Sequence, residues 1–175
     1  MLRYIGIIAL VVSGLLFGTA LLLSPEYKIE QSIIIQARPA AIHPYVNNLK
    51  QWPKWMPWQE LEPDTVTRYG DLTQGVGASQ SWQGRGGNGH LHITASSPDN
   101  GIAYDVFFGD ETTPSISAVQ YKVLDGNSTQ VSWSFSGEVH VPIVGGLFAL
   151  LVTSMSNDMY RKGLQKLKTV VEQGK

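Results

Sequence analysis

The sequence contains no cysteine, which excludes disulfide bonds, thiolate catalysis and zinc sites built on cysteine. Charge is also scarce, because charged residues make up only 15% of the 175 residues and the formal net charge is -1. No long basic run exists that could follow a phosphate backbone. We therefore expect no nucleic-acid partner.

Familiar catalytic and cofactor patterns are missing as well. The sequence has no G-x-S-x-G nucleophile elbow, and no pair of carboxylates is predicted to face the core. Residues 84–89 match G-x-G-x-x-G, but the residues that follow alternate like a strand, whereas dinucleotide binding needs a helix there. We expect a hairpin loop and no cofactor. His90 and His92 share one face of a predicted strand without a third ligand, so we expect no metal.

The amino-terminal segment is strongly apolar. Tyr4 to Leu23 runs for about 20 residues without a charge, which is long enough to cross a bilayer. This run is longer than the apolar core of a cleaved signal peptide. We predict a single-pass membrane anchor and linker over residues 1–26, followed by one domain over residues 27–175. Arg3 favours a cytoplasmic amino terminus and an extracytoplasmic domain.

The middle of the chain has the pattern of antiparallel strands. Tyr27–Ala37 is rich in isoleucine and predicts a first strand, and Pro39–Lys50 predicts a short helix. Six alternating runs follow, separated by glycine, asparagine and aspartate. We predict strands over residues 62–69, 75–83, 90–96, 102–108, 116–124 and 129–140. Apolar side chains fall on one face of these strands, so the sheet needs a single cover.

The last segment, Pro142 to Glu172, is the only long helix expected after the anchor. Its apolar residues form a broad stripe, with Gly163 placed to allow close backbone approach. We predict an α+β fold in which a curved sheet of about seven strands wraps around this helix. The start of the helix, residues 143–152, is apolar on all sides. Two interpretations stand equal: a helix start buried under loops, or a lid or membrane-facing patch.

Two groups of side chains are candidates for ligand contact. Three tryptophans, Trp52, Trp55 and Trp58, cluster around two prolines, and packing is favoured over ligand contact for any single ring. Three polar side chains are predicted to point inward. They are Gln80, Tyr104 and Tyr121. Dispersed hydrogen-bonding groups of this kind suit the orientation of a ligand better than acid-base catalysis.

The order of these parts, together with five sequence stretches, resembles the START-like helix-grip superfamily of the polyketide cyclase/dehydrase and lipid-transport type (SRPBCC). The stretches are I-I-I-Q-A-R-P-A-A-I-H-P-Y-V at 33–46, W-P-K-W-M-P-W at 52–58, V-G-A-S-Q-S-W at 76–82, T-Q-V-S-W-S-F-S-G at 129–137 and G-L-Q-K-L-K at 163–168. The resemblance covers residues 27–172. It implies a deep apolar cavity between the sheet and the long helix, used for lipids, sterols and polyketides. The predicted anchor departs from the family pattern and favours a ligand found in or near the membrane.

The sequence thus predicts a membrane-anchored binding protein for a hydrophobic small molecule or lipid. The alternatives are a polyketide cyclase/dehydratase-like enzyme and a protein-interaction module with a filled core. The side chains expected to contact the ligand are Trp55, Trp58, Gln80, Trp82, Tyr104, Phe108, Tyr121, Trp133, Phe135, Phe148, Met155 and Met159.

Overall fold

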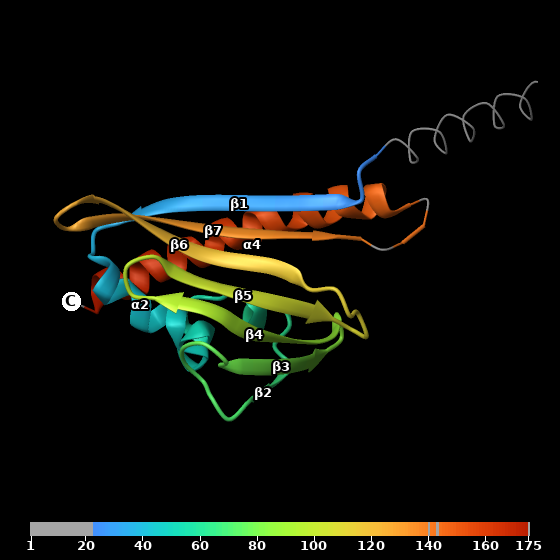
Figure 1. Ribbon diagram of the computed structural model, residues 1–175, viewed down its shortest axis with the longest axis horizontal. Helices are drawn as coiled ribbons and strands as arrows, with labels where there is room; N and C mark the ends of the chain where they lie inside the picture. The colour runs from blue at the N-terminus through green and yellow to red at the C-terminus, as the bar shows by residue number, and fades with distance from the viewer. Residues whose placement is uncertain (1–22, 140, 143, 175) are drawn as a thin grey trace, which may run out of the picture.

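The structure is a computed structural model that describes residues 23–139, 141–142 and 144–174, without the side chains of Gln59 and Met155. Figure 1 shows a sheet accompanied by one long helix and several short ones. The helices are α2 (Pro39–Asn47), the 3-10 helix η1 (Leu49–Lys54), α3 (Trp58–Leu61) and α4 (Gly145–Gln173). The strands are β1 (Glu26–Ile35), β2 (Val66–Tyr69), β3 (Ser79–Gly84), β4 (Gly87–Ser97), β5 (Gly101–Phe108), β6 (Ser115–Asp125) and β7 (Ser128–Glu138). The predicted α+β helix-grip arrangement is confirmed for the described residues.

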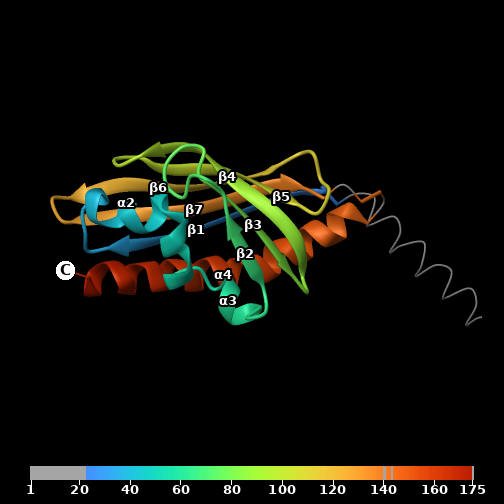
Figure 2. The same cartoon turned by 90° about the horizontal axis from the view of Figure 1, so that it is seen from below.

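The sheet is antiparallel throughout its seven strands, in the order β1-β7-β6-β5-β4-β3-β2. β1 pairs with β7 along its whole length, from Glu26 opposite Glu138 to Ile35 opposite Thr129. α4 lies along β1 and β7, and α2 contacts β5 and β6, so both helices cover the inner face of the sheet (Figure 2). The inner face is therefore the face that carries the core.

Alternation along the strands predicts the inner face well where the strands are regular. Val131, Trp133 and Phe135 of β7 are buried, as are Leu91 and Ile93 of β4. After Ile93 the register shifts by a bulge, which leaves Ala95 exposed although simple alternation places it inside.

Three predicted boundaries are wrong for local reasons. Val76 lies in a loop and is 59% exposed, because Gly75 and Gly77 take positive φ angles of 77° and 84° that interrupt the strand. The strand predicted over 75–83 therefore starts later, as β3 at Ser79. The strand predicted over 62–69 is also shorter, because β2 has only four residues. The predicted helix over 39–50 ends early, because Asn48 takes an extended conformation that separates α2 from η1.

The buried stripe of α4 is narrower than its apolar content predicts. Tyr160, Leu164, Leu167 and Val171 are buried at spacings of four, three and four residues. Phe148, by contrast, is 47% exposed, so the first turns of the helix present a large aromatic side chain to the outside. The buried stripe of large side chains is thus confined to the carboxyl-terminal half of α4.

Among the described residues, no helix is long and apolar enough to cross a membrane. The predicted anchor, Tyr4 to Leu23, lies outside the described residues except for its last one, and so does His140 at the end of the last predicted strand. Leu23 and Pro25 are described, and they lie against the start of α4. The chain therefore enters the domain beside Gly145 and Gly146.

Gly163 allows α4 to approach the sheet. A Cβ atom at this position would lie 2.8 Å from a ring carbon of Trp133 and 3.4 Å from Pro57. We predict that Gly163→Ala lowers the free energy of unfolding by about 1 kcal/mol, because overpacking costs about 1–3 kcal/mol and the better helix propensity of alanine returns about 1 kcal/mol. Thermal unfolding of the full-length chain, followed by near-ultraviolet circular dichroism, measures the change.

The neighbouring exposed position supplies the control. Lys162→Ala, on the outer side of the same turn, is expected to leave the melting temperature nearly unchanged. A Gly163→Ala protein that melts at or above the temperature of the parent would contradict the close approach.

Candidate functional site

The base of the interior, next to α2 and η1, is filled by aromatic rings. Trp52 lies 5.2 Å from Tyr104 and 6.0 Å from Trp55, measured between ring centroids. Trp55 lies 5.3 Å from Trp133, and Trp133 lies 3.9 Å from Tyr160 of α4. All five side chains are buried. These rings occupy the space in which the sequence predicts the deepest part of a cavity.

The polar atoms of these rings find partners within the protein. The indole N–H of Trp133 donates to Tyr104 Oη at 3.0 Å and to Ser117 Oγ at 3.2 Å. Burial raises the pKa of Tyr104 to about 12 and also raises the pKa of Tyr160. Both hydroxyls therefore stay protonated at neutral pH. In this position the hydroxyl of Tyr104 is already engaged within the core.

The opposite end of the inner face is open. Phe108, the last residue of β5, is 41% exposed, and its ring lies 5.9 Å from Trp82 and 6.2 Å from Phe135. The half-buried Trp82 ring extends over Gly89, where a Cβ atom would collide with it. We call Trp82, Phe108 and Phe135 the open end. The alternation of β3 and β5 correctly places their side chains on the inner face but predicts burial that Phe108 does not have.

The three inward polar side chains predicted from the sequence lie apart. Gln80 is half-buried on β3 and faces the same side as Leu91, two residues from Trp82. Tyr104 lies in the middle of the sheet. Tyr121 lies near the other end, with its hydroxyl 3.4 Å from His43 Nδ1. Because each belongs to a different part of the inner face, they do not form one catalytic group.

The remaining predicted contact residues lie in different surroundings. Trp55 and Trp133 are fully buried in the base, where Trp55 donates its N–H to the Tyr45 carbonyl at 3.0 Å. Trp58 is exposed at the surface, and its N–H points at Met56 Sδ, 2.9 Å away. Met159 is half-buried against the core. The side chain of Met155 lies outside the described part of the structure.

His43 forms a polar cluster that the sequence does not predict, because its partners come from distant segments. Its ring is 8% exposed, with Nε2 3.3 Å from Ser96 Oγ and Nδ1 next to Tyr121. Ser96 donates to Asn47 Oδ1 at 2.6 Å. Burial lowers the pKa of His43, and the negative charge of Asp99 partly offsets that change. The neutral imidazole is thus the form that the fold favours.

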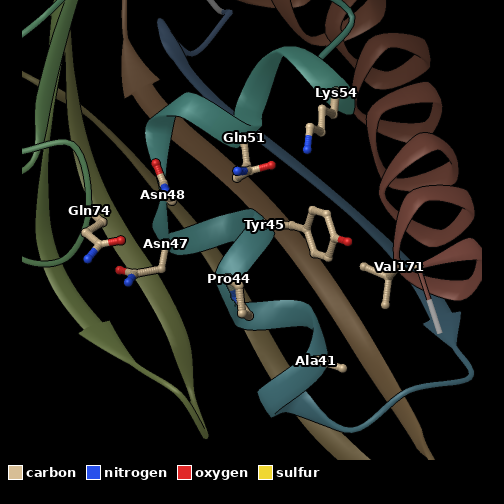
Figure 3. Close-up of a pocket in the computed structure, with 10 residues that line it drawn as sticks. Ala41, Pro44, Tyr45, Asn47, Asn48, Gln51, Lys54, Gln74 and Val171 are labelled. Atoms are coloured by element: carbon tan, nitrogen blue, oxygen red, sulfur yellow. The ribbon is translucent and has the colours of Figure 1, made fainter.

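A recess with a volume of about 510 Å³ lies beside this cluster, between α2, η1 and the carboxyl end of α4. Figure 3 shows Tyr45 and Gln51 pointing toward α4, while Asn47 points away toward Gln74. Gln51 Oε1 is buried, and no partner for it is found among the described residues. Four of the ten residues that line the recess carry side-chain amides, so its lining is mixed and differs from the apolar site that the sequence predicts.

The outer face of the sheet carries the paired histidines. The His90 ring stacks on Phe107 with centroids 4.6 Å apart, and His92 lies 3.7 Å from Asp105. A second recess of about 310 Å³ is lined by residues of β2, β3 and β4 from both faces of the sheet, among them Gln80 and His90. Within the described ranges, no three histidine or acidic side chains converge as a metal site would require.

Comparison with known proteins agrees with this architecture. The sequence model of the family described as polyketide cyclase/dehydrase and lipid transport matches residues 26–172. The chain belongs to this family. Among curated proteins, no sequence match is found. The family description names both cyclase or dehydrase chemistry and lipid transport. The filled base differs from the deep cavity that the resemblance implies.

Solved structures share the fold of this polyketide cyclase/dehydrase family member at low sequence identity. A protein from Chromobacterium violaceum has a TM-score of 0.59 at 14% identity, covering 83% of this chain and 98% of its own. The Aha1 dimer from Colwellia psychrerythraea has a TM-score of 0.59 at 18% identity, covering 85% and 98%. DynU16, from the dynemicin biosynthetic locus, has a TM-score of 0.59 at 11% identity, covering 85% and 48%. At these identities the likeness shows the fold alone.

The lowered pKa of His43 predicts a pH dependence of stability. Below the ordinary histidine pKa of about 6.5, the unfolded chain binds a proton that the folded protein resists, so the free energy of unfolding falls as the pH drops through that value. We expect His43→Gln to flatten this part of the curve between pH 7.5 and about 5.5. Chemical denaturation of the full-length chain at a series of pH values measures the slope.

His90→Gln is the matched control, because it removes an exposed histidine from the outer face. It is expected to leave the slope close to that of the parent. An unchanged slope in His43→Gln, with native near-ultraviolet circular dichroism, would show that burial of His43 does not govern the dependence.

Proposed function

We propose that this chain is a membrane-anchored binding protein for a hydrophobic small molecule or a lipid, and that the ligand contacts the open end. One observation carries the proposal: beside the buried Phe135, the rings of Trp82 and Phe108 face inward yet are incompletely covered. Phe108 is 41% exposed beside the half-buried Trp82. Apolar surface left in water is unfavourable, and an apolar ligand placed between these rings would remove it from water.

The polar side chain closest to these rings suits the same role. Gln80 lies on the same strand and face as Trp82 and is half-buried, so its amide can orient a ligand head group without adding a charge. The filled base supports a shallow position for the ligand. Trp52, Trp55 and Trp133 already occupy the deeper space, so a ligand would lie across the inner face near the mouth.

The predicted anchor is part of this proposal. Tyr4 to Leu23 has the length and composition of a single membrane-spanning helix. With Arg3 on the cytoplasmic side, the domain would lie on the extracytoplasmic side. Such an anchor holds the open end near a reservoir of apolar molecules, which supports a lipid or a membrane-dissolved compound as the ligand.

The enzymatic alternative is a cyclase or dehydratase reaction, as the family description names. In the described part of the chain, Gln80, Tyr104 and Tyr121 do not converge, and Tyr104 is held by Trp133 and Ser117. A proposal of binding therefore fits the geometry better. The interaction-module alternative fits the filled base but leaves the exposed rings of the open end unexplained.

The test is photo-crosslinking with a fatty acid that carries a diazirine on its acyl chain. The full-length chain is reconstituted in phosphatidylcholine nanodiscs, exposed to the probe and light, and digested for peptide mass spectrometry. We expect labels on the peptides that carry Trp82 and Phe108. Phe108→Ser is expected to reduce this labelling about tenfold, because loss of a buried aromatic contact costs about 1.5–3 kcal/mol.

Ile116→Ser is the matched control, because it removes an exposed apolar side chain from the outer face of β6. Labelling of the anchor peptide is expected in all three proteins and serves as an internal standard. Equal labelling in Phe108→Ser and Ile116→Ser, or no label on β3 and β5, would exclude the open end as the ligand site.

A further inference from the structure

In the first turns of α4 the large apolar side chains are exposed, whereas a helix packed on a protein usually buries them. Four large side chains, those of Leu147, Phe148, Leu150 and Leu151, are 47–54% exposed. The small residues Gly145, Gly146 and Ala149 are buried instead. At 100° per residue the two groups fall on opposite sides of the helix. We call the exposed side, Leu147 to Leu151, the apolar face.

The apolar face ends abruptly along the helix. Further along α4 the exposed positions are polar, beginning with Ser154 and continuing with Asp158 and Arg161, which pair with each other at 2.9 Å. From Leu147 to Leu151 the helix rises about 6 Å. A short apolar face of this kind suits shallow insertion into the boundary layer of a bilayer rather than a crossing of it.

The predicted membrane anchor ends against the first turn of α4. Leu23, the last residue of the apolar segment Tyr4–Leu23, lies against Gly146, where a Cβ atom would collide with it. Pro25 lies against Gly145 in the same way, 3.3 Å from the position of a Cβ atom. The segment predicted to cross the membrane therefore ends against the glycine side of the first turn of α4, opposite to the apolar face and within one turn of it. If this segment crosses a membrane, the start of α4 lies next to the membrane surface.

We propose that the apolar face of α4 rests in the surface layer of the lipid bilayer, next to the anchor, so that the domain docks on the membrane in a fixed orientation. The proposal rests on the anchoring in the proposed function but not on any ligand. The contact is apolar in kind, so it forms on neutral lipids and is insensitive to salt. Leu147 and Leu151 supply the contact, and Gly145 and Gly146 supply the close approach to Leu23.

The docked orientation also determines where the open end lies relative to the membrane. In Figure 1 the end of β5 and the start of β1 lie at the same end of the molecule as the start of α4. Phe108 terminates β5 there, and the anchor leaves beside β1. The docked orientation would therefore place the open end on the side of the domain that faces the bilayer.

The absence of cysteine makes the test direct, because each single-cysteine variant carries one label. Phe148→Cys, Leu151→Cys, Lys162→Cys and Ile116→Cys are spin-labelled in the full-length chain and reconstituted in phosphatidylcholine vesicles. Accessibility to oxygen and to a water-soluble nickel complex reports depth. We expect labels at 148 and 151 to contact lipid, and labels at 162 and 116 to contact water. The same pattern is expected at low and high salt.

Three results would overturn the docking. Labels at 148 and 151 as accessible to nickel as the label at 116 would show that the apolar face stays in water. Dipolar broadening between labels at 148 would show that a second copy covers it. A protein that does not float with the vesicles would remove the anchor itself. Lipid contact at 148 and 151 combined with failure of diazirine labelling at Phe108 would keep the docking and reject the ligand site.

A double variant separates the apolar face from the anchor. Leu147→Ser with Leu151→Ser leaves residues 1–26 intact, so flotation is expected to persist, while nickel accessibility at 148 is expected to rise to the level at 116. Unchanged accessibility at 148 in this variant would show that the anchor alone positions the helix and that the apolar face contributes nothing.

Discussion

The fold depends on the side chain of Trp133 and its neighbours. Its indole N–H bonds Tyr104 of β5 and Ser117 of β6, and its ring packs on Tyr160 of α4 and Trp55 beyond η1. One residue of β7 thus joins three strands, the long helix and the tryptophan-rich turn. Burial of so large a ring is favourable only because the N–H has partners and because Gly163 leaves room for the helix.

The sequence predicts the parts of this arrangement better than their contacts. Alternation identifies the inner faces of β5 and β7, and periodicity identifies α4, because burial of one side imposes those periods. Periodicity does not reveal which buried ring meets which, so Trp55 and Trp133 are equally compatible with a wall of a cavity and with a filled core. The structure assigns them to the filled core. His43 illustrates the same limit, since its partners Ser96 and Tyr121 are far away in sequence.

Exposure at the open end was beyond prediction for a geometric reason. Alternation with a period of two predicts on which side of β5 Phe108 lies. Whether that side is covered depends on how far α4 and the turn after η1 reach along the sheet. The carboxyl-terminal half of α4 covers the base, and its first turns leave the other end bare. The interior is therefore closed at the base and exposed at the open end. The proposed ligand site is this exposed end rather than a large internal cavity.

The four-residue strand β2 has a consequence for contacts between neighbouring molecules. A sheet with free edges invites strand addition by another chain. Here α4 runs along β1, with Lys168 donating to the Ile34 carbonyl at 2.9 Å, and the other edge is the short β2, bounded by Gly70. β2 offers few free backbone groups, and Lys168 engages one carbonyl of β1. The edge at β2 is thus a poor template for strand addition by a neighbouring chain.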